Sequence, residues 1–385
     1  MKRYLGFALA ILFLGVVSPA TGQEDCPSVA DLKRLIAEDG DFRTVVLEMF
    51  ENLQPMPDSS PNPWQGKSLD DLYEFLNEWY RFLPNRDDGL DRIIEFSLLY
   101  RNNPAGLRFV LEEPGLSWTL SFVEARGQFM DSEASAEGIQ PWLDDPAIRN
   151  EDFVQPVDGF KSFNDFFIRD LRPGARAITG IDDDSVVVSP ADGILNIINN
   201  DLRSDSQIPM KGRMSLNLSQ LLEGSVHIDQ FIGGTAVACF LLPDNYHHFH
   251  APVSGVVTES KESVGDRLFG MHDIIDMFNK GNPGYNRDFS VFERFRHGYF
   301  IIETPSMGHV AVVPVGLQTV GSVVFEEKFK SIEAGPGRAV YKGEKLGHFA
   351  YGGSTVFLLF EKGQFNAIKV RQGQQVGIAS GASGH

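Results

Sequence analysis

The stretch Tyr351-Gly352-Gly353-Ser354-Thr355 runs directly into the apolar residues Val356-Phe357-Leu358-Leu359-Phe360. A glycine pair followed by an apolar run of this length is typical of a tight turn that leads into a buried β-strand. Glycine has no Cβ, so the backbone at Gly353 can adopt conformations closed to other residues, and another group can approach its carbonyl closely. Taken alone, the stretch predicts a hairpin turn before a core strand.

Two upstream segments place further reactive side chains beside apolar runs. Asp192 lies in Ser189-Pro190-Ala191-Asp192-Gly193, and His247 and His250 lie in Tyr246-His247-His248-Phe249-His250. A serine hydroxyl is a weak nucleophile until a base takes its proton, and a carboxylate commonly orients that base. Asp192, a histidine and Ser354 therefore supply the parts of an activated serine.

Together and in this order, the three segments resemble the phosphatidylserine decarboxylase family of pyruvoyl enzymes. That family carries a Ser-Pro-x-Asp-Gly segment, a Tyr-His-x-x-His segment and a Gly-Ser-Thr near the C-terminus. The resemblance covers roughly residues 160–365, with further matches in Phe166-Phe167-Ile168-Arg169-Asp170-Leu171, Arg172-Pro173-Gly174-Ala175-Arg176 and Lys342-Gly343-Glu344-Lys345-Leu346-Gly347. Two departures concern the substrate: Gly352 stands where the family often has Leu, and Phe295-Arg296-His297 replaces the Asn-Glu-Arg of many phospholipid-acting members.

The resemblance implies that the chain cuts itself between Gly353 and Ser354 and converts Ser354 into a covalent pyruvoyl group. By the same resemblance, His250 is the base that takes the Ser354 proton, Asp192 orients His250, and His247 reprotonates the α-carbon after CO₂ leaves. No metal ion and no separate cofactor is implied. The large and small chains of one precursor are expected to stay associated, and a homodimer is left open.

The composition of the chain changes along its length, which predicts two structural parts. Residues 23–155 are predicted to be helical; Ser68, for example, precedes apolar residues that recur every three or four positions as far as Pro84. Residues 156–370 contain short β-rich runs separated by Gly and Pro, which predicts a mostly antiparallel sandwich or barrel-like catalytic domain. Residues 371–385 form a Gly/Ser-rich tail that we expect to be flexible. We therefore expect an α+β fold.

Residues 1–22 have the pattern of a secretory signal peptide: Lys2 and Arg3, an apolar stretch, then the small residues Ala20-Thr21-Gly22. We expect an exported protein, periplasmic or secreted, with peripheral membrane contact. An uncleaved membrane anchor is the alternative, although the apolar stretch is short for a span of about 20 residues. The chain has 52 acidic and 34 basic residues, a formal charge of −18. This charge disfavours nucleic acid as a partner and does not favour an anionic membrane surface.

The cysteines and the remaining histidine carry weaker signals. With only Cys26 and Cys239 present, no disulfide framework exists. We expect Cys239, inside an apolar run, to be a buried thiol without a bridge to Cys26. His248 occupies a variable position of the family and is expected at the surface, and Arg169 is expected to pair with an acidic neighbour. A zinc site built on the histidines of residues 247–250 is an alternative, but no suitably spaced partner segment accompanies them.

Two substrate classes fit the resemblance. The catalytic-domain match favours phosphatidylserine, decarboxylated to phosphatidylethanolamine in phospholipid biosynthesis. The N-terminal layout resembles the extension of pyruvoyl-type L-tryptophan decarboxylases, which makes a free aromatic L-amino acid the alternative. Residues 267–280 are the best candidate for an exposed apolar loop that docks on a bilayer, although core packing is the commoner fate of such a run. A non-catalytic binding relative or a zinc peptidase-like protein is the alternative of another class.

Overall fold

A computed structural model describes residues 24–86, 88–199, 202, 216–271, 290–317, 323–333, 335–350, 354–365, 367–368 and 372. The expected signal segment, Gly353 of the expected cleavage bond and all of the expected tail except Gln372 lie outside these residues. The domain boundary at residue 155 stays a prediction.

The N-terminal part is helical, as the sequence predicts. Its helices are α1 (Pro27–Glu38), α2 (Gly40–Glu51), α3 (Leu69–Arg81), α4 (Asp91–Ser97), α5 (Pro104–Leu111) and α6 (Gly115–Asp131). The predicted cap of α3 is present: the Ser68 hydroxyl accepts from the Asp71 backbone N–H, and the Asp71 carboxylate accepts from the Ser68 N–H. The apolar stripe of α3 is buried, including Leu72, Leu76 and Trp79.

A chain of short elements connects α6 to the β-rich part. These are η1 (Glu133–Gly138), α7 (Gln140–Leu143), η2 (Pro146–Ile148), η3 (Asn150–Asp152) and α8 (Phe163–Phe167). The aromatic residues of this region form a small core of their own, in which Trp142 lies edge-on to Phe163 at 6.1 Å. Its last helix, α8, brings the Phe-Phe segment against the catalytic part of the chain.

The described strands form two antiparallel sheets. The seven-stranded sheet has the order β1 (Ile194–Asn199), β2 (Thr235–Leu241), β10 (Ser354–Phe360), β6 (His309–Gly316), β5 (His297–Glu303), β4 (Gly255–Val264), β8 (Arg338–Val340). The three-stranded sheet has the order β3 (His248–His250), β9 (Lys345–Phe349), β7 (Val323–Phe325). Short helices α9 (Leu218–Leu221), η4 (Ile228–Phe231), η5 (Ser290–Arg294) and η6 (Glu327–Phe329) lie between strands. The expected α+β class is confirmed, with open sheets in the described part in place of a closed barrel.

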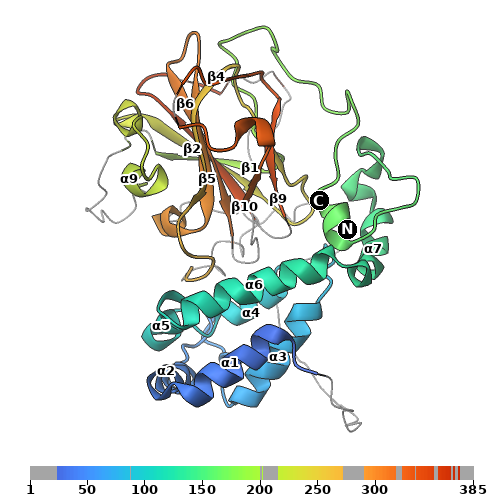
Figure 1. Cartoon of the computed structure of the whole chain (residues 1–385), viewed down its shortest axis with the longest axis vertical. Helices are drawn as coiled ribbons and strands as arrows, with labels where there is room; N and C mark the ends of the chain where they lie inside the picture. Colours follow the sequence, from blue (N-terminus) through green and yellow to red (C-terminus); the bar gives the residue numbers. More distant parts are fainter. Residues whose placement is uncertain are drawn as a thin grey trace.

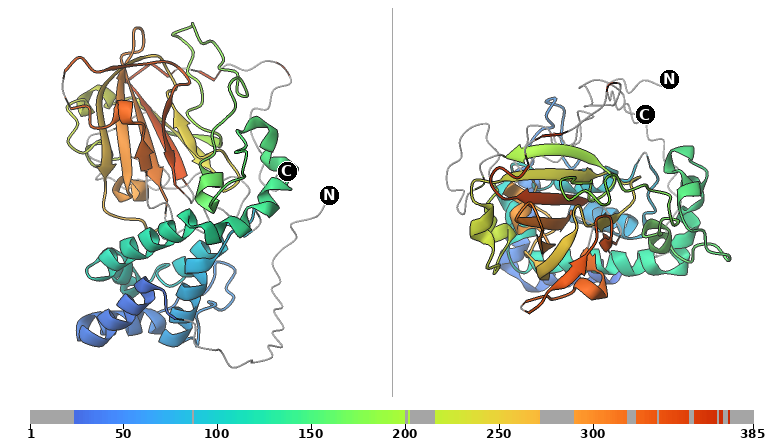
Figure 2. Two further views of the ribbon diagram at one scale, coloured as in Figure 1. Left: turned by 45° about the vertical axis from the view of Figure 1, so that its right-hand side comes forward. Right: turned by 90° about the horizontal axis from the view of Figure 1, so that it is seen from above.

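Strand β10 is buried on both faces because each side of the large sheet is covered. Phe357 and Leu359 belong to the core shared with the N-terminal helices, whereas Val356, Leu358 and Phe360 belong to the core that faces the small sheet. Successive side chains of a strand point to opposite faces, so a continuous apolar run is the pattern that such a doubly covered strand requires. Helices α1–α6 gather on one side of the strands, and α6 lies nearest to them (Figures 1 and 2).

The described part of the predicted bilayer-docking loop is core. Leu268, Phe269 and Met271 are each no more than 2% exposed. The Phe269 ring lies 5.2 Å from that of Phe96 and 6.3 Å from that of Trp79, so the segment is packed under the N-terminal helices. Of the two alternatives for this run, core packing therefore holds for residues 268–271, and residues 272–280 lie outside the described chain. In the described chain, no helix has the length and apolarity needed to cross a membrane.

Candidate active site

Ser354 begins β10 and is fully buried. The strand pairs with β2 on one side and β6 on the other, with Ser354 opposite Leu241 and Gly316. Because side chains alternate along a strand, Ser354 points to the same face as Val356 and toward the small sheet. The ladder on both sides fixes this residue at the end of the central strand.

His247 is the imidazole that contacts Ser354. Its Nδ1 lies 3.3 Å from the Ser354 Oγ, and its Nε2 lies 3.1 Å from the Leu242 carbonyl oxygen. A carbonyl can only accept, so Nε2 carries the ring proton and Nδ1 is left to accept from the serine hydroxyl. The Phe167 ring stacks on the imidazole at 4.1 Å. The Ser354 hydroxyl therefore faces the lone pair of a neutral histidine.

The charge state of His247 follows from its surroundings. The pKa of His247 is lowered to about 3, chiefly by burial and to a smaller extent by the nearby Arg169 cation, against the opposing effect of the hydrogen bond to Leu242. The imidazole is consequently uncharged at neutral pH. In this form it can take a proton from Ser354 or return one to an atom formed at that position.

His250 lies close by but has other partners. Its Nδ1 lies 2.9 Å from the Gly343 carbonyl oxygen, so this nitrogen carries the proton, and its Nε2 accepts from the Tyr246 hydroxyl at 3.3 Å. Burial lowers the pKa of His250 as well. Within the described chain, the structure brings His247 to Ser354 and does not bring His250 into contact with it. The division of roles between the two histidines stays a prediction.

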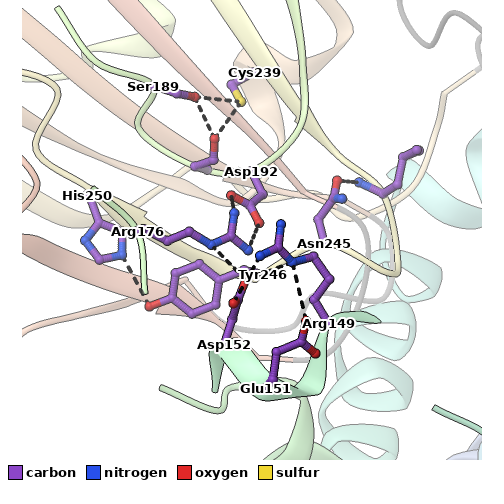
Figure 3. Close-up of polar contacts among 12 residues, drawn as sticks. Arg149, Glu151, Asp152, Arg176, Ser189, Asp192, Cys239, Asn245, Tyr246 and His250 are labelled. Carbon is purple, nitrogen blue, oxygen red and sulfur yellow. Dashed lines mark hydrogen bonds and ion pairs between the residues drawn. The ribbon is translucent and has the colours of Figure 1, made fainter. Parts of the chain in front are cut away.

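Asp192 is held by an arginine. Its two carboxylate oxygens lie 3.2 and 3.1 Å from the two terminal nitrogens of Arg176 (Figure 3). The segment is nevertheless adjacent to β3, because the His250 backbone N–H donates to the Pro190 carbonyl at 2.7 Å. Gly193 permits this packing, since a Cβ there would lie 2.2 Å from the Phe240 carbonyl oxygen. No hydrogen bond joins Asp192 to His250 among the described residues.

Two expectations for neighbouring residues are wrong. His248 is 1% exposed, with its Nε2 2.8 Å from the Ile168 carbonyl and its ring stacked on Tyr246 at 4.5 Å. Arg169 makes no ion pair with any described acid; its guanidinium is buried over the rings of Phe153 and Phe166, at 4.0 and 4.3 Å. Part of this cover comes from other segments, Ile168 over His248 and Phe153 over Arg169, which local spacing does not reveal.

Sequence reasoning assigned no role to Tyr246 or Arg176, although both lie in segments that carry the resemblance. Each touches a predicted catalytic residue, Tyr246 through His250 and Arg176 through Asp192. The feature of the sequence that could have identified Tyr246 and Arg176 was their position in a segment that carries the resemblance.

The rival zinc site finds no support in the geometry. Among the described residues, no three His, Cys, Asp or Glu side chains gather so that they could hold a metal ion. Both cysteines are buried and unpaired, as expected. Burial raises the pKa of the Cys239 thiol to about 11, which keeps this sulfur uncharged and unreactive.

Comparisons with known proteins agree with these features. A family model described as phosphatidylserine decarboxylase matches residues 163–382. Phosphatidylserine decarboxylase proenzyme 2 of rice is 34% identical over 241 residues, which are 62% of this chain and 36% of that relative. The proenzymes of Clostridium novyi and Fusobacterium nucleatum are 32% and 30% identical, over 63% and 61% of this chain and 75% and 72% of theirs. This chain thus spans about a third of the rice relative and most of the two bacterial ones.

Proposed function

The chain belongs to the phosphatidylserine decarboxylase family, and we propose that it is a self-processing, pyruvoyl-dependent carboxy-lyase that converts phosphatidylserine to phosphatidylethanolamine and CO₂. The observation that carries this proposal is the buried Ser354 hydroxyl, 3.3 Å from the unprotonated nitrogen of a neutral imidazole. Residue 354 is thereby held away from water, beside an imidazole that can exchange a proton with an atom formed at that position.

Self-processing requires the Ser354 oxygen to attack the carbonyl carbon of Gly353. The C–N bond then breaks and the acyl group moves to oxygen as an ester. A base then removes the Cα proton of residue 354, and elimination of the Gly353 carboxylate from Cβ leaves a dehydroalanine at residue 354. Water then releases ammonia and leaves a pyruvoyl group at the new N-terminus. A base must take the hydroxyl proton and an acid must protonate the departing nitrogen, which two neutral histidines can provide.

The pairing of β10 does not depend on the bond before Ser354. The residue sits at the end of β10, and the whole strand is paired on both sides, from Ser354 opposite Leu241 to Phe360 opposite Thr235. Cleavage before Ser354 would leave β10 as the central, doubly covered strand of the large sheet. We therefore propose that the small chain stays bound to the large one after cleavage.

The pyruvoyl carbonyl, once formed, supplies the electron sink that decarboxylation needs. The protein itself keeps residue 354 buried away from water and places the His247 ring beside it. The proposed role of His247 is to return a proton to the α-carbon, because it is the ring in contact with residue 354. The proposed role of His250, by family resemblance, is to act as the base of the maturation step with Asp192 as its orienting group.

The experiment that tests the function combines processing with turnover. Purified wild-type protein should run as two chains and release CO₂ from phosphatidylserine in mixed micelles, whereas Ser354→Ala should stay full length and inactive. Free tryptophan and other amino acids are assayed in parallel. Release of CO₂ from a free amino acid, with none from the lipid, would replace the substrate and leave the maturation chemistry standing. An intact serine at residue 354 in wild type would remove the enzyme function altogether.

We propose in addition that the protein is exported, which residues 1–22 support by their charged, apolar and small-residue order. Contact with a membrane from outside is proposed only because the proposed substrate is a lipid. N-terminal sequencing of the mature protein tests the export. An N-terminus near Gln23 agrees with export, and a chain that keeps Lys2 and Arg3 contradicts cleavage of the signal.

A further inference from the structure

Residues 149–154, which follow the N-terminal helices, lie directly against the site. The Asp152 backbone carbonyl accepts from the Arg172 N–H at 2.9 Å, which fixes the segment beside the start of the β-rich part. The Phe153 ring lies 5.8 Å from that of Tyr246, the tyrosine that hydrogen-bonds His250. The family model begins at residue 163, so this segment lies outside the matched region. Its contacts are therefore a feature of this chain's N-terminal part.

One arginine connects this segment to the predicted catalytic carboxylate. The two terminal nitrogens of Arg176 lie 3.2 and 3.1 Å from the two carboxylate oxygens of Asp192, and the Arg176 Nε lies 3.6 Å from the Asp152 Oδ2 (Figure 3). A bidentate arginine fixes a carboxylate in direction as well as in distance. The orientation of Asp192 thus depends on where the guanidinium of Arg176 is held.

Asp152 contacts this guanidinium at its Nε, the nitrogen that does not contact Asp192. Its side chain is only 9% exposed, and its Oδ2 accepts no hydrogen bond, so charge pairing must compensate its burial. Arg149 provides part of that compensation, with its Nε 3.1 Å from the same oxygen. The negative charge of Asp152 therefore lies fixed between two arginines, and Arg176 is the one that also touches the site.

We propose that Asp152 and Arg176 are positioning residues for self-processing: Asp152 anchors Arg176, and Arg176 orients the Asp192 carboxylate. This inference rests on the proposed function. It gives the N-terminal part of the chain a task in maturation, because the anchor comes from residue 152 while the carboxylate comes from the β-rich part. Neither residue touches Ser354, so each acts through Asp192.

The test follows processing of newly made full-length chain, produced by cell-free translation in a short radioactive pulse and resolved on gels during a chase. Asp152→Asn keeps the shape of the side chain and removes its charge, and it should slow cleavage about five-fold, the upper range for one partly exposed ion pair. Asp152→Glu keeps the charge and changes the shape, and it should retain at least half of the wild-type rate. A packing role for Asp152 would reverse this order.

A double variant shows whether Asp152 acts through Arg176. Arg176→Gln removes both contacts to Asp192 and should slow cleavage more than Asp152→Asn does. With Arg176 gone, Asp152→Asn should cause no further loss, because residues in one chain of contacts are not additive. Independent, multiplied losses would overturn the proposal.

The matched control is Glu151→Gln. It removes one negative charge next to Asp152, from an exposed side chain that approaches only Arg149, at 3.9 Å, and it should process at the wild-type rate. Thermal melting of each variant identifies any that fails to fold. Wild-type chain that never cleaves overturns the proposed function itself. Wild-type chain that cleaves, with Asp152→Asn cleaving equally fast, overturns only this inference.

Discussion

Replacing His248 with glutamine should make the protein more resistant to acid. The His248 ring is 1% exposed, and burial lowers its pKa to about 2, with smaller effects in the same direction from Lys345, His348 and His250. Among the described residues, the carboxylate that faces the ring is that of Asp170, whose Oδ1 lies 3.9 Å from the His248 Nδ1 and which is itself largely exposed. We therefore expect the folded protein to keep this ring neutral between pH 8 and pH 5.

The size of the effect follows from proton binding. In the unfolded chain His248 has an ordinary pKa near 6.5. Between pH 8 and pH 5 the His248 ring therefore binds almost one proton in the unfolded state that it does not bind in the folded state. The free energy of unfolding is unaffected above pH 6.5 and falls as the pH drops below it, by about 2 kcal/mol at pH 5. His247, whose pKa is about 3, imposes a similar loss.

The assay is urea unfolding at pH 8 and pH 5, in a Ser354→Ala background so that chain cleavage does not intervene. Glutamine can donate to the Ile168 carbonyl as the His248 Nε2 does, so the fold is retained. His248→Gln should lose about 2 kcal/mol less than its parent between the two pH values. Equal losses in the two proteins would show that His248 already titrates normally when folded and would refute the burial argument.

Three further predictions concern the site and the core. His247→Ala should still cleave itself but lose decarboxylation activity by two to four orders of magnitude, because the ring beside residue 354 is gone. His250→Ala should stay full length. An unprocessed His247→Ala chain would instead make His247 the base of maturation. Phe269→Ala should destabilise the protein by about 4 kcal/mol in thermal or urea unfolding. The control Leu47→Ala should change stability little, because the Leu47 side chain is 41% exposed. A loss below about 1 kcal/mol for Phe269→Ala would contradict the packing of this segment under the helices. The Cys239 thiol, with its pKa raised to about 11 by burial, should resist iodoacetamide at pH 8 until the protein is denatured; labelling of native protein at this residue would contradict its burial.

Elements with a strong local pattern could be predicted from the sequence. The capping box at Ser68 and the apolar spacing of α3 depend on residues within one helix, and both are present. The apolar run after Ser354 is a strand for an equally local reason, since it fits only a strand that is covered on both faces. The order of the Asp, His and Ser segments indicated the family because motif order does not depend on the details of folding.

The features that could not be predicted depend on contacts between distant segments. His248 is buried because the Ile168 carbonyl, 80 residues earlier, lies over it. Leu268 and Phe269 are core because the N-terminal helices cover them, and nothing in their own segment distinguishes a covered run from an exposed one. The contacts from Asp152 through Arg176 to Asp192 require three segments to meet, so residue spacing within the sequence does not predict them.

The mass of the small chain in purified wild-type protein shows directly whether Ser354 becomes a pyruvoyl group. We predict a fragment that begins at residue 354, is lighter by one ammonia than the same peptide with an N-terminal serine, and is blocked to Edman degradation. The Ser354→Ala protein should give only the full-length mass. A wild-type chain that is intact, or a fragment that starts with an ordinary serine, would contradict the conversion of Ser354 to a pyruvoyl group.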